Sequence, residues 1–287
     1  MTEQPAPNLF LVGAAKSGTT SLWKALCDHP QVFMTRMKEP HYFSHVVPSP
    51  QWASRFPVTR TASEYRRLFA DANGERYRGE ASTSYLWSPA AADRIRQEEP
   101  NARIIAVLRD PIERAYSHYW NDVREGLEKQ PFEAALRAEL SRQHVGQWGR
   151  DSLYIDIGRY FRQVTAYIDR FEDRVLVLSY ADLVSEPNRA LTRTWHFLGL
   201  PPAAGEQQLA RENASQVARG KLSHTLLGSH RLRLLGRSVL PPRGRALARD
   251  LLLKPAARPP MGDVARAILM EALLDDWQST QQAFLST

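Results

Sequence analysis

The sequence is poor in cysteine: Cys27 is the only one in 287 residues. A single cysteine excludes an internal disulfide framework and a cysteine-rich zinc site, and it fits a reducing compartment. The chain also lacks any apolar run near the roughly 18 residues that span a bilayer, which excludes a membrane-embedded chain. Its first residues lack the basic and apolar stretches of a secretory signal peptide, so we expect a cytoplasmic protein.

The composition does not divide the chain, which has no repeat period and no low-complexity tract. Its 43% hydrophobic and 24% charged residues are typical of a globular protein, and we expect a single domain over residues 1–287. Within it we expect a core at about 9–200 and a variable region at about 201–260 that borders or covers a site. Apolar residues at helical spacing predict a C-terminal helix at about 263–285.

Basic residues outnumber acidic residues, 38 against 31, which gives a net charge of +7 and favours an anionic partner. Phosphate, sulfate, an acidic sugar and nucleic acid all carry the required charge. No zinc, RNP-like or helix-turn-helix pattern supports nucleic-acid binding, and the arginine-rich stretch at 221–258 is typical of a solvated helix surface. No paired histidine and carboxylate motif is present either, so no metal site is predicted.

Apolar runs of strand length alternate with amphipathic stretches along the chain. The run Leu9–Ala15 precedes a polar turn and a helix, and Arg103–Leu108 leads into Asp110 and Pro111, which are typical of an N-cap and a first helical residue. A third run, Val175–Leu178, lies between two predicted helices. Strands that alternate with helices predict an α/β fold of three layers, in which a central parallel sheet is flanked by helices.

The turn after the first predicted strand, Gly13–Thr20, has the properties of an anion-binding loop. Its backbone N–H groups converge on a helix N-terminus, Lys16 adds positive charge, and the hydroxyl groups can donate hydrogen bonds. The pattern differs from a Walker A motif, which requires lysine at position 19, where Thr19 stands. The competing interpretation is that Lys16 is a solvated turn residue and that Thr19 or Thr20 only caps the helix.

A second candidate anion contact follows the second predicted strand. Arg109 leaves that strand, and Ser117 lies seven residues, about two helical turns, beyond the N-cap Asp110. An arginine at the strand end and a hydroxyl on the same side of the helix can bind one phosphate together. The alternative is that Arg109 pairs with Asp110 or Glu113 and that Ser117 is a boundary residue of the helix.

The segment Met37–Phe43 sets a polar pair among bulky aromatic residues. A carboxylate beside aromatic rings is partly desolvated and is thereby a stronger base, which suits Glu39 to general-base catalysis. His41 competes for that role, although a structural histidine in an aromatic cluster is the commoner case. The hydroxyl-rich segment Glu80–Tyr85 follows a predicted strand, and we expect it to line an acceptor pocket.

In combination these motifs resemble the PAPS-dependent sulfotransferases, most strongly bacterial domains similar to the heparan sulfate N- and O-sulfotransferases. The combination covers most of residues 9–200 and implies a P-loop-like fold. The matching segments are Lys-Ser-Gly-Thr-Thr at 16–20, Lys-Glu-Pro-His-Tyr-Phe at 38–43, Arg-Asp-Pro at 109–111 with Ser117, Gly158–Tyr160, Val175–Leu183 and Phe197–Leu200.

The resemblance implies roles for individual residues. Arg109 and Ser117 are implied to bind the 3′-phosphate of PAPS. Glu39 matches the acidic residue proposed as the base in the heparan sulfate relatives. The residues implied to bind the 5′-phosphosulfate are Lys16, Ser17, Gly18, Thr19 and Thr20, with Ser21 continuing the helix start.

Two features depart from the family pattern. Ala81 stands where relatives often have a lysine near the sulfuryl group. The late Lys-Gly-Arg loop over the cofactor has only a loose match, formed by Arg219, Gly220 and Lys221.

The resemblance implies a sulfotransferase that moves the sulfuryl group of PAPS to a hydroxyl or an amine of a small-molecule or carbohydrate acceptor and releases PAP. Lys16 and Glu39 are the implied catalytic residues: Lys16 serves the leaving phosphate, and Glu39 takes the proton of the acceptor. Two alternatives stay open at this point. One is a P-loop kinase that transfers phosphate from ATP to a small molecule, and the other is a non-catalytic nucleotide-binding module.

Overall fold

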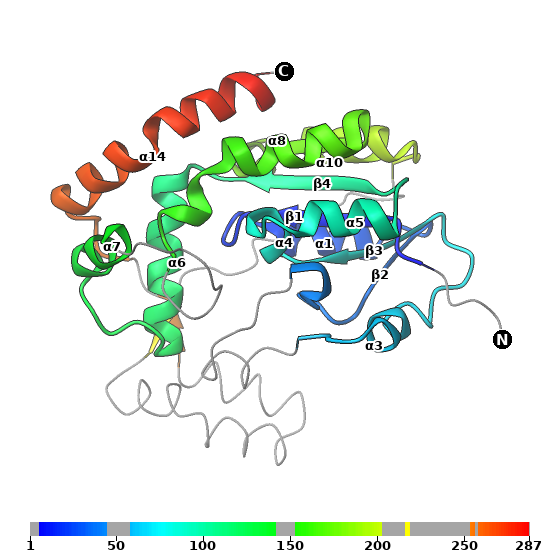
Figure 1. Cartoon of the computed structure of the whole chain (residues 1–287), viewed down its shortest axis with the longest axis horizontal. Coiled ribbons are helices and arrows are strands. Elements are labelled where there is room, and N and C mark those ends of the chain that lie inside the picture. The colour runs from blue at the N-terminus through cyan, green and yellow to red at the C-terminus, as the bar shows by residue number, and fades with distance from the viewer. Residues whose placement is uncertain are drawn as a thin grey trace, which may run out of the picture.

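The computed structural model of the chain describes residues 6–44, 58–141, 153–202, 216–218, 253–255 and 258–286. Its centre is a five-stranded sheet in the order β2-β3-β1-β4-β5, in which all neighbouring strands are parallel (Figure 1). This confirms the predicted central parallel sheet. The strands are β1 (Leu9–Gly13), β2 (Val32–Met34), β3 (Tyr77–Ala81), β4 (Arg103–Leu108) and β5 (Val175–Ser179).

Helices connect the strands and flank the sheet, as predicted (Figure 1). The helices that lie between the strands or next to them are α1 (Thr19–Cys27), α3 (Ala62–Arg67), α4 (Ser84–Trp87), α5 (Ala91–Glu98), α6 (Pro111–Glu125), α7 (Phe132–Leu140), α8 (Tyr160–Phe171), α9 (Tyr180–Ser185) and α10 (Pro187–Leu198). The chain also forms 3-10 turns η1 (Tyr42–Ser44), η2 (Asp156–Gly158) and η3 (Glu172–Arg174), the antiparallel pair β6 (Gln216–Ala218) and β7 (Leu253–Pro255), and the long helix α14 (Asp263–Phe284).

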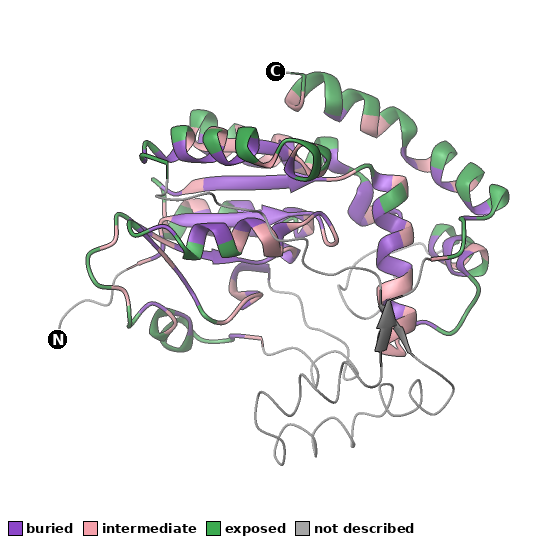
Figure 2. Ribbon diagram, turned by 180° about the vertical axis from the view of Figure 1, so that it is seen from behind, coloured by how far each residue is buried: buried purple, intermediate pink, exposed green. Residues whose placement is uncertain are grey.

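Alternate residues of the central strands pack against different helical layers, because successive side chains of a strand point to opposite faces. Phe10 and Val12 of β1 belong to a core cluster with residues of α4, α5 and α8, whereas Leu9 and Leu11 pack with α1, α9 and α10. Both faces of the sheet are thus covered, which explains why the strands are apolar throughout. Figure 2 shows the buried strands and the exposed residues on the outer helix surfaces.

The strand order fixes where a ligand is expected. β1 lies in the middle of the sheet and later strands lie on both sides of it, so the order reverses at β1. In open α/β sheets ligands bind outside the carboxyl ends of the strands at such a point. The loops that follow β1, β2, β3 and β4 leave the sheet at this edge, and α6 stands there beside α7 and α14 (Figure 1).

The start of α6 forms as predicted. Asp110 is the N-cap residue, and its Oδ1 accepts hydrogen bonds of 2.9 Å from the backbone N–H groups of Ile112 and Glu113. Pro111 is the first helical residue, a position where the missing N–H has no consequence. This cap fixes where α6 begins after β4 and so helps to set the direction of α6, which borders the site.

Candidate active site

Glycines shape the loop after β1, residues 13–20, which we name the anion loop. Gly18 has a φ of +83°, and a Cβ there would lie 2.8 Å from a ring carbon of Tyr180. A Cβ at Gly13 would lie 2.8 Å from the methyl group of Thr19 and 2.9 Å from a backbone oxygen of β4. Only glycine therefore allows the loop to approach β4 and α9 this closely.

The start of α1 offers hydrogen-bond donors to a ligand. The first N–H groups of a helix have no partner within it, and no side chain of the described residues caps this helix. The hydroxyl of Ser17 is fully buried in the loop and has no hydrogen-bond partner among the described residues. An uncapped helix start beside a buried hydroxyl fits a phosphate or sulfate group.

Four basic residues, Lys16, Arg109, Arg124 and Arg258, form what we name the cationic cluster. Lys16 donates a hydrogen bond of 3.4 Å to Asn121 of α6. Burial, followed by the charges of Arg124 and Arg258, lowers the pKa of Lys16 to about 8. Burial, with the charges of Arg109 and Arg124, also lowers the pKa of Arg258. These positive charges repel one another, and an anionic ligand would relieve that repulsion. The cationic cluster therefore supports an anion site at the anion loop.

Arg109 is directed at the anion loop. Its Nη1 donates a hydrogen bond of 3.1 Å to the backbone oxygen of Lys16, and its guanidinium carbon lies 4.7 Å from the centroid of the Tyr180 ring. The carboxylate of Asp110 caps α6, a different role from the pairing with Arg109 considered above. Ser117 is buried in α6, the helix that also carries Arg124.

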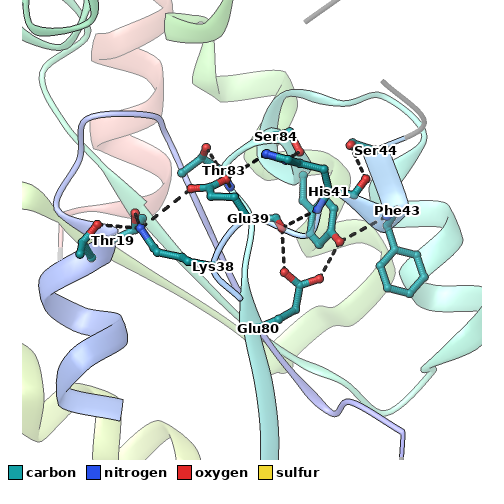
Figure 3. A network of polar contacts seen from close by, with 12 residues as sticks. Thr19, Lys38, Glu39, His41, Phe43, Ser44, Glu80, Thr83 and Ser84 are labelled. Atoms are coloured by element: carbon teal, nitrogen blue, oxygen red, sulfur yellow. Dashed lines mark hydrogen bonds and ion pairs between the residues drawn. The ribbon is translucent and has the colours of Figure 1, made fainter. Parts of the chain in front are cut away.

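The loop after β2, residues 35–41, carries the candidate base and is named here the base loop (Figure 3). Lys38 Nζ donates hydrogen bonds to the hydroxyls of Thr20, at 2.7 Å, and of Thr19, at 3.3 Å. The same ammonium lies 3.9 Å from Oε1 of Glu39, whose side chain is 25% exposed. The Glu39 carboxylate is therefore accessible and lies next to the first turn of α1.

The base loop has an unusual backbone that β3 and the residues after it hold in place. Glu39 and His41 have φ values of +63° and +58°, and such conformations cost about 1–3 kcal/mol each in residues other than glycine. The Glu39 N–H donates to the carbonyl of Ala81 at 2.8 Å, and the His41 N–H donates to Ser82 Oγ at 3.2 Å. Oε2 of Glu39 accepts from the N–H and the hydroxyl of Thr83, at 2.9 and 3.0 Å.

A buried carboxylate, Glu80, lies beside the residues that hold the base loop (Figure 3). It accepts hydrogen bonds from the hydroxyls of Tyr85 at 2.6 Å, Ser82 at 2.7 Å and Tyr65 at 3.0 Å. Complete burial raises the pKa of Glu80 to about 7 in spite of these three donors. Glu80 thus fixes Ser82, which in turn holds the backbone of the base loop at His41.

The hydroxyl-rich segment Glu80–Tyr85, which we expected to line an acceptor pocket, mainly binds other groups of the protein. Ser82, Ser84 and Tyr85 are buried and bind groups of the protein itself, so they do not line an acceptor pocket. Only Thr83 of these hydroxyl residues is partly exposed, and it holds Glu39. The segment supports the base loop instead.

His41 lies behind Glu39. Its Nε2 is 3.7 Å from Oε2 of Glu39, and its Nδ1 is 2.7 Å from Ser84 Oγ. Burial lowers the pKa of His41, so the ring is neutral at pH 7, and its side chain is 2% exposed. Of the two candidate bases, the partly exposed carboxylate of Glu39 is therefore the one that an acceptor molecule can reach.

Several residues of the site received no role from the sequence, although Lys38 lies within the matching segment 38–43. Lys38, Arg124 and Arg258 had no assigned role, although Arg124 follows Ser117 by the same two-turn spacing that separates Ser117 from Asp110. Ala81 ends β3 as a buried residue without charge, whereas Lys38 brings an ammonium to the anion loop. The predicted cofactor contacts Arg219, Gly220 and Lys221 lie outside the described residues.

Two further findings concern metal and membrane. In the ranges that the structure describes, no three histidine, cysteine, aspartate or glutamate residues come together as a metal site. Among the described helices, none has both the length and the hydropathy needed to cross a bilayer.

The fold and the site together define the class of protein. A parallel sheet with an anion loop between β1 and α1 is typical of P-loop-like nucleotide-binding enzymes, and Glu39 adds a candidate general base. The sulfotransferase domain family matches residues 6–219, and the chain belongs to that family. This confirms the predicted sulfotransferase class and its P-loop-like fold, and it favours that class over the kinase and the non-catalytic module.

Known relatives agree with this assignment. One similar solved structure is the crystal structure of a sulfotransferase from Alicyclobacillus acidocaldarius, whose sequence is 31% identical to this chain. The match covers 80% of this chain and 96% of that chain, with a TM-score of 0.65. Heparan sulfate glucosamine 3-O-sulfotransferase 6 of Homo sapiens is 29% identical over 195 residues, which are 68% of this chain and 52% of that protein. The membrane-associated sulfotransferase kil1 of Dictyostelium discoideum is 35% identical over 114 residues, 39% of this chain and 22% of that protein. The chain thus spans about half the length, or less, of these two curated relatives.

Proposed function

We propose that the protein is a PAPS-dependent sulfotransferase that moves the sulfuryl group to a hydroxyl or an amine of a small-molecule or carbohydrate acceptor and releases PAP. The contact between the two loops carries this proposal: Lys38 of the base loop binds the hydroxyls of Thr19 and Thr20 in the anion loop, which brings Glu39 to the anion site. A base fixed beside a donor-binding loop is what in-line group transfer requires.

The anion loop and the cationic cluster fit PAPS by their chemistry. The backbone N–H groups at the start of α1, the buried hydroxyl of Ser17 and the ammonium of Lys16 suit the 5′-phosphosulfate. Arg109 and Ser117 would hold the 3′-phosphate, for which a guanidinium and a hydroxyl are suitable donors. When bound, PAPS supplies the sulfuryl group, and these residues orient it.

Glu39 is the proposed general base. Its Oε2 already accepts two hydrogen bonds from Thr83, whereas Oε1 faces Lys38 and the start of α1. We assign the proton of the acceptor to Oε1 for that reason. His41 packs behind the carboxylate and positions it.

The acceptor class and the cellular location belong to the same proposal. The heparan sulfate relative, whose name specifies 3-O-sulfation of glucosamine, supports a carbohydrate hydroxyl as the acceptor. The exposed free thiol of Cys27 fits a cytoplasmic location, because the cytoplasm keeps thiols reduced. Fractionation of the cells that produce the protein tests this location, and recovery in the membrane fraction contradicts it.

The experiment that tests the proposed function is an acceptor screen. The full chain is incubated with PAPS that carries heavy sulfur and with a panel of sugars, phenols, alcohols and amines, and products are detected by their gain of a labelled sulfate group. We expect product with the wild type and with Glu271→Gln, which removes an exposed carboxylate of α14. We expect little product with Glu39→Gln. Transfer of phosphate from labelled ATP, with no transfer from PAPS, contradicts the proposal.

A further inference from the structure

A lysine ammonium lies on the hydroxyls at the start of α1 (Figure 3). Lys38 Nζ is 2.7 Å from Thr20 Oγ1 and 3.3 Å from Thr19 Oγ1, and its side chain is only 22% exposed. In P-loop NTPases a Ser or Thr of the phosphate-binding loop holds Mg²⁺. Here the hydroxyls of the corresponding helix start bind a cation that the chain itself supplies.

The charge of this ammonium is balanced by the base. Lys38 Nζ lies 3.9 Å from Oε1 of Glu39, on the side of the carboxylate that Thr83 does not occupy. Burial lowers the pKa of Lys38, and the charge of Glu39 acts in the opposite direction. Any event that neutralises Glu39 therefore leaves the ammonium without its counter-charge.

We propose that Lys38 is a second catalytic cation of sulfuryl transfer, coupled to Glu39 and standing in the place that a divalent cation takes in P-loop NTPases. This inference rests on the proposed function. In the transfer step, a bond forms between the acceptor oxygen or nitrogen and sulfur, and the acceptor proton passes to Oε1 of Glu39. The bond between sulfur and the bridging oxygen breaks, and its electron pair stays on that oxygen, which PAP keeps in its phosphate.

The coupling makes the effect of Lys38 specific to the transition state. Before the reaction, the ammonium is paired with the Glu39 carboxylate. As Glu39 takes up the proton, Lys38 loses that partner and acts fully on the negative charge that grows on the bridging oxygen. An interaction that strengthens only in the transition state raises kcat without tightening the binding of PAPS or PAP.

The test compares Lys38→Met, which keeps the length of the side chain without its charge, with Lys38→Arg, which keeps the charge. The control is Lys24→Met, which replaces an exposed lysine of α1, the helix that Lys38 contacts. Single-turnover rates are measured with saturating PAPS and an acceptor, PAP affinity is measured by calorimetry, and thermal unfolding verifies the fold. We expect Lys38→Met to lower the rate by about 10²–10³-fold, the effect of losing one preorganised donor. The PAP affinity of Lys38→Met should stay within about threefold of the wild-type affinity. Lys38→Arg should recover part of the rate, and Lys24→Met should match the wild type.

Three results would overturn the inference and leave the proposed function standing. An unchanged rate in Lys38→Met shows that the ammonium does not act in the reaction. Equal losses of rate and PAP affinity show that Lys38 only ties the two loops together. Loss of wild-type activity in excess EDTA, restored by Mg²⁺, shows that a divalent cation does this work, whereas activity that survives EDTA supports Lys38. An inactive wild type overturns both the proposed function and this inference, while turnover in the wild type and in Lys38→Met alike overturns the inference alone.

Discussion

The anion loop and the base loop meet at the same edge of the sheet, yet different interactions hold them. The anion loop takes its shape from its own backbone, with Gly18 in a left-handed conformation and Gly13 pressed against β4. The base loop takes its shape from residues about forty positions later, where Ser82 and Thr83 hold it and buried Glu80 fixes Ser82. Lys38 joins the two loops through Thr19 and Thr20, but their other supports are separate. We therefore expect cofactor binding and catalysis to respond separately to the following variants.

The largest expected effect is on turnover. Glu39→Gln keeps the shape of the side chain and removes the proton acceptor, so kcat should fall by roughly 10²–10⁴-fold. PAPS affinity should not fall, because the carboxylate does not shape the anion loop and its loss leaves the Lys38 ammonium free to act on the bound anion. Steady-state kinetics and calorimetry of the same preparation measure both quantities.

His41→Ala is the comparison for this prediction and should cost less activity than Glu39→Gln. A dead His41→Ala variant that remains folded, together with an active Glu39→Gln variant, would show that the histidine is the base. Equal loss of PAPS affinity in Glu39→Gln would show that the two loops are not separate.

The next effect concerns the buried support of the base loop. The pKa of Glu80 is raised from its ordinary 4.5 to about 7, so its contribution to stability is fully present below pH 4.5 and is lost as pH rises through 7. Glu80→Gln removes this titration. Between pH 5 and pH 8 the wild type should therefore lose stability relative to the variant, by up to about 3 kcal/mol.

Denaturant unfolding of wild type and Glu80→Gln at a series of pH values measures that difference. Glu271→Gln, which removes an exposed carboxylate on α14, should follow the wild type throughout. Parallel curves for wild type and Glu80→Gln would mean that Glu80 is ionised in the folded protein across this range.

Arg109→Ala should weaken PAPS binding by about 1.5–3 kcal/mol, the contribution of a hydrogen bond to a charged group. Adenosine 5′-phosphosulfate lacks the 3′-phosphate, so its affinity should barely change. Arg103→Ala is a matched control, because Arg103 also stacks on an aromatic ring, Phe197, but lies at the opposite end of β4. Equal losses for the two ligands in calorimetry would refute the assignment of Arg109 to the 3′-phosphate.

The smallest effect is expected from Gly18→Ala, for which Gly74→Ala is the control. Both glycines have φ above +80°, so both variants should lose about 1 kcal/mol of stability from backbone strain alone. A Cβ at Gly18 also meets the Tyr180 ring, on which Arg109 stacks, whereas a Cβ at Gly74 meets no atom within 4 Å among the described residues. Only Gly18→Ala should therefore weaken PAP binding, and equal PAP affinities in the two variants would show that the loop tolerates the added methyl group.

The two loops also differ in how far the sequence predicts them. The anion loop is local: an apolar strand, a polar turn with glycine and a helix follow one another, so their pattern predicts both the fold and the position of Lys16. Arg109 could be predicted in the same way, because it directly follows β4. The predicted roles of Arg219, Gly220 and Lys221 stay predictions, since those residues lie outside the described ranges.

The supports of the base loop could not be predicted from pattern. Glu39 stands out beside aromatic residues, but Glu80 becomes a support only because Tyr65 and Tyr85 converge on it from different elements. The contact of Lys38 with Thr20 joins residues 18 positions apart that no helical or strand period relates. Such contacts depend on the packing of the whole sheet edge, which a single sequence does not display.

The most direct measurement of the separation between the two loops is calorimetric titration of PAP into the wild type, Glu39→Gln and Arg109→Ala, with ATP and Mg²⁺ as the competing ligand. We predict PAP binding that ATP does not displace, with an affinity in Glu39→Gln no lower than in the wild type and with weaker affinity in Arg109→Ala. PAP binding that is lost in Glu39→Gln, or tight ATP binding without PAP binding, would contradict the assignment of the anion loop to PAPS and of the base loop to catalysis.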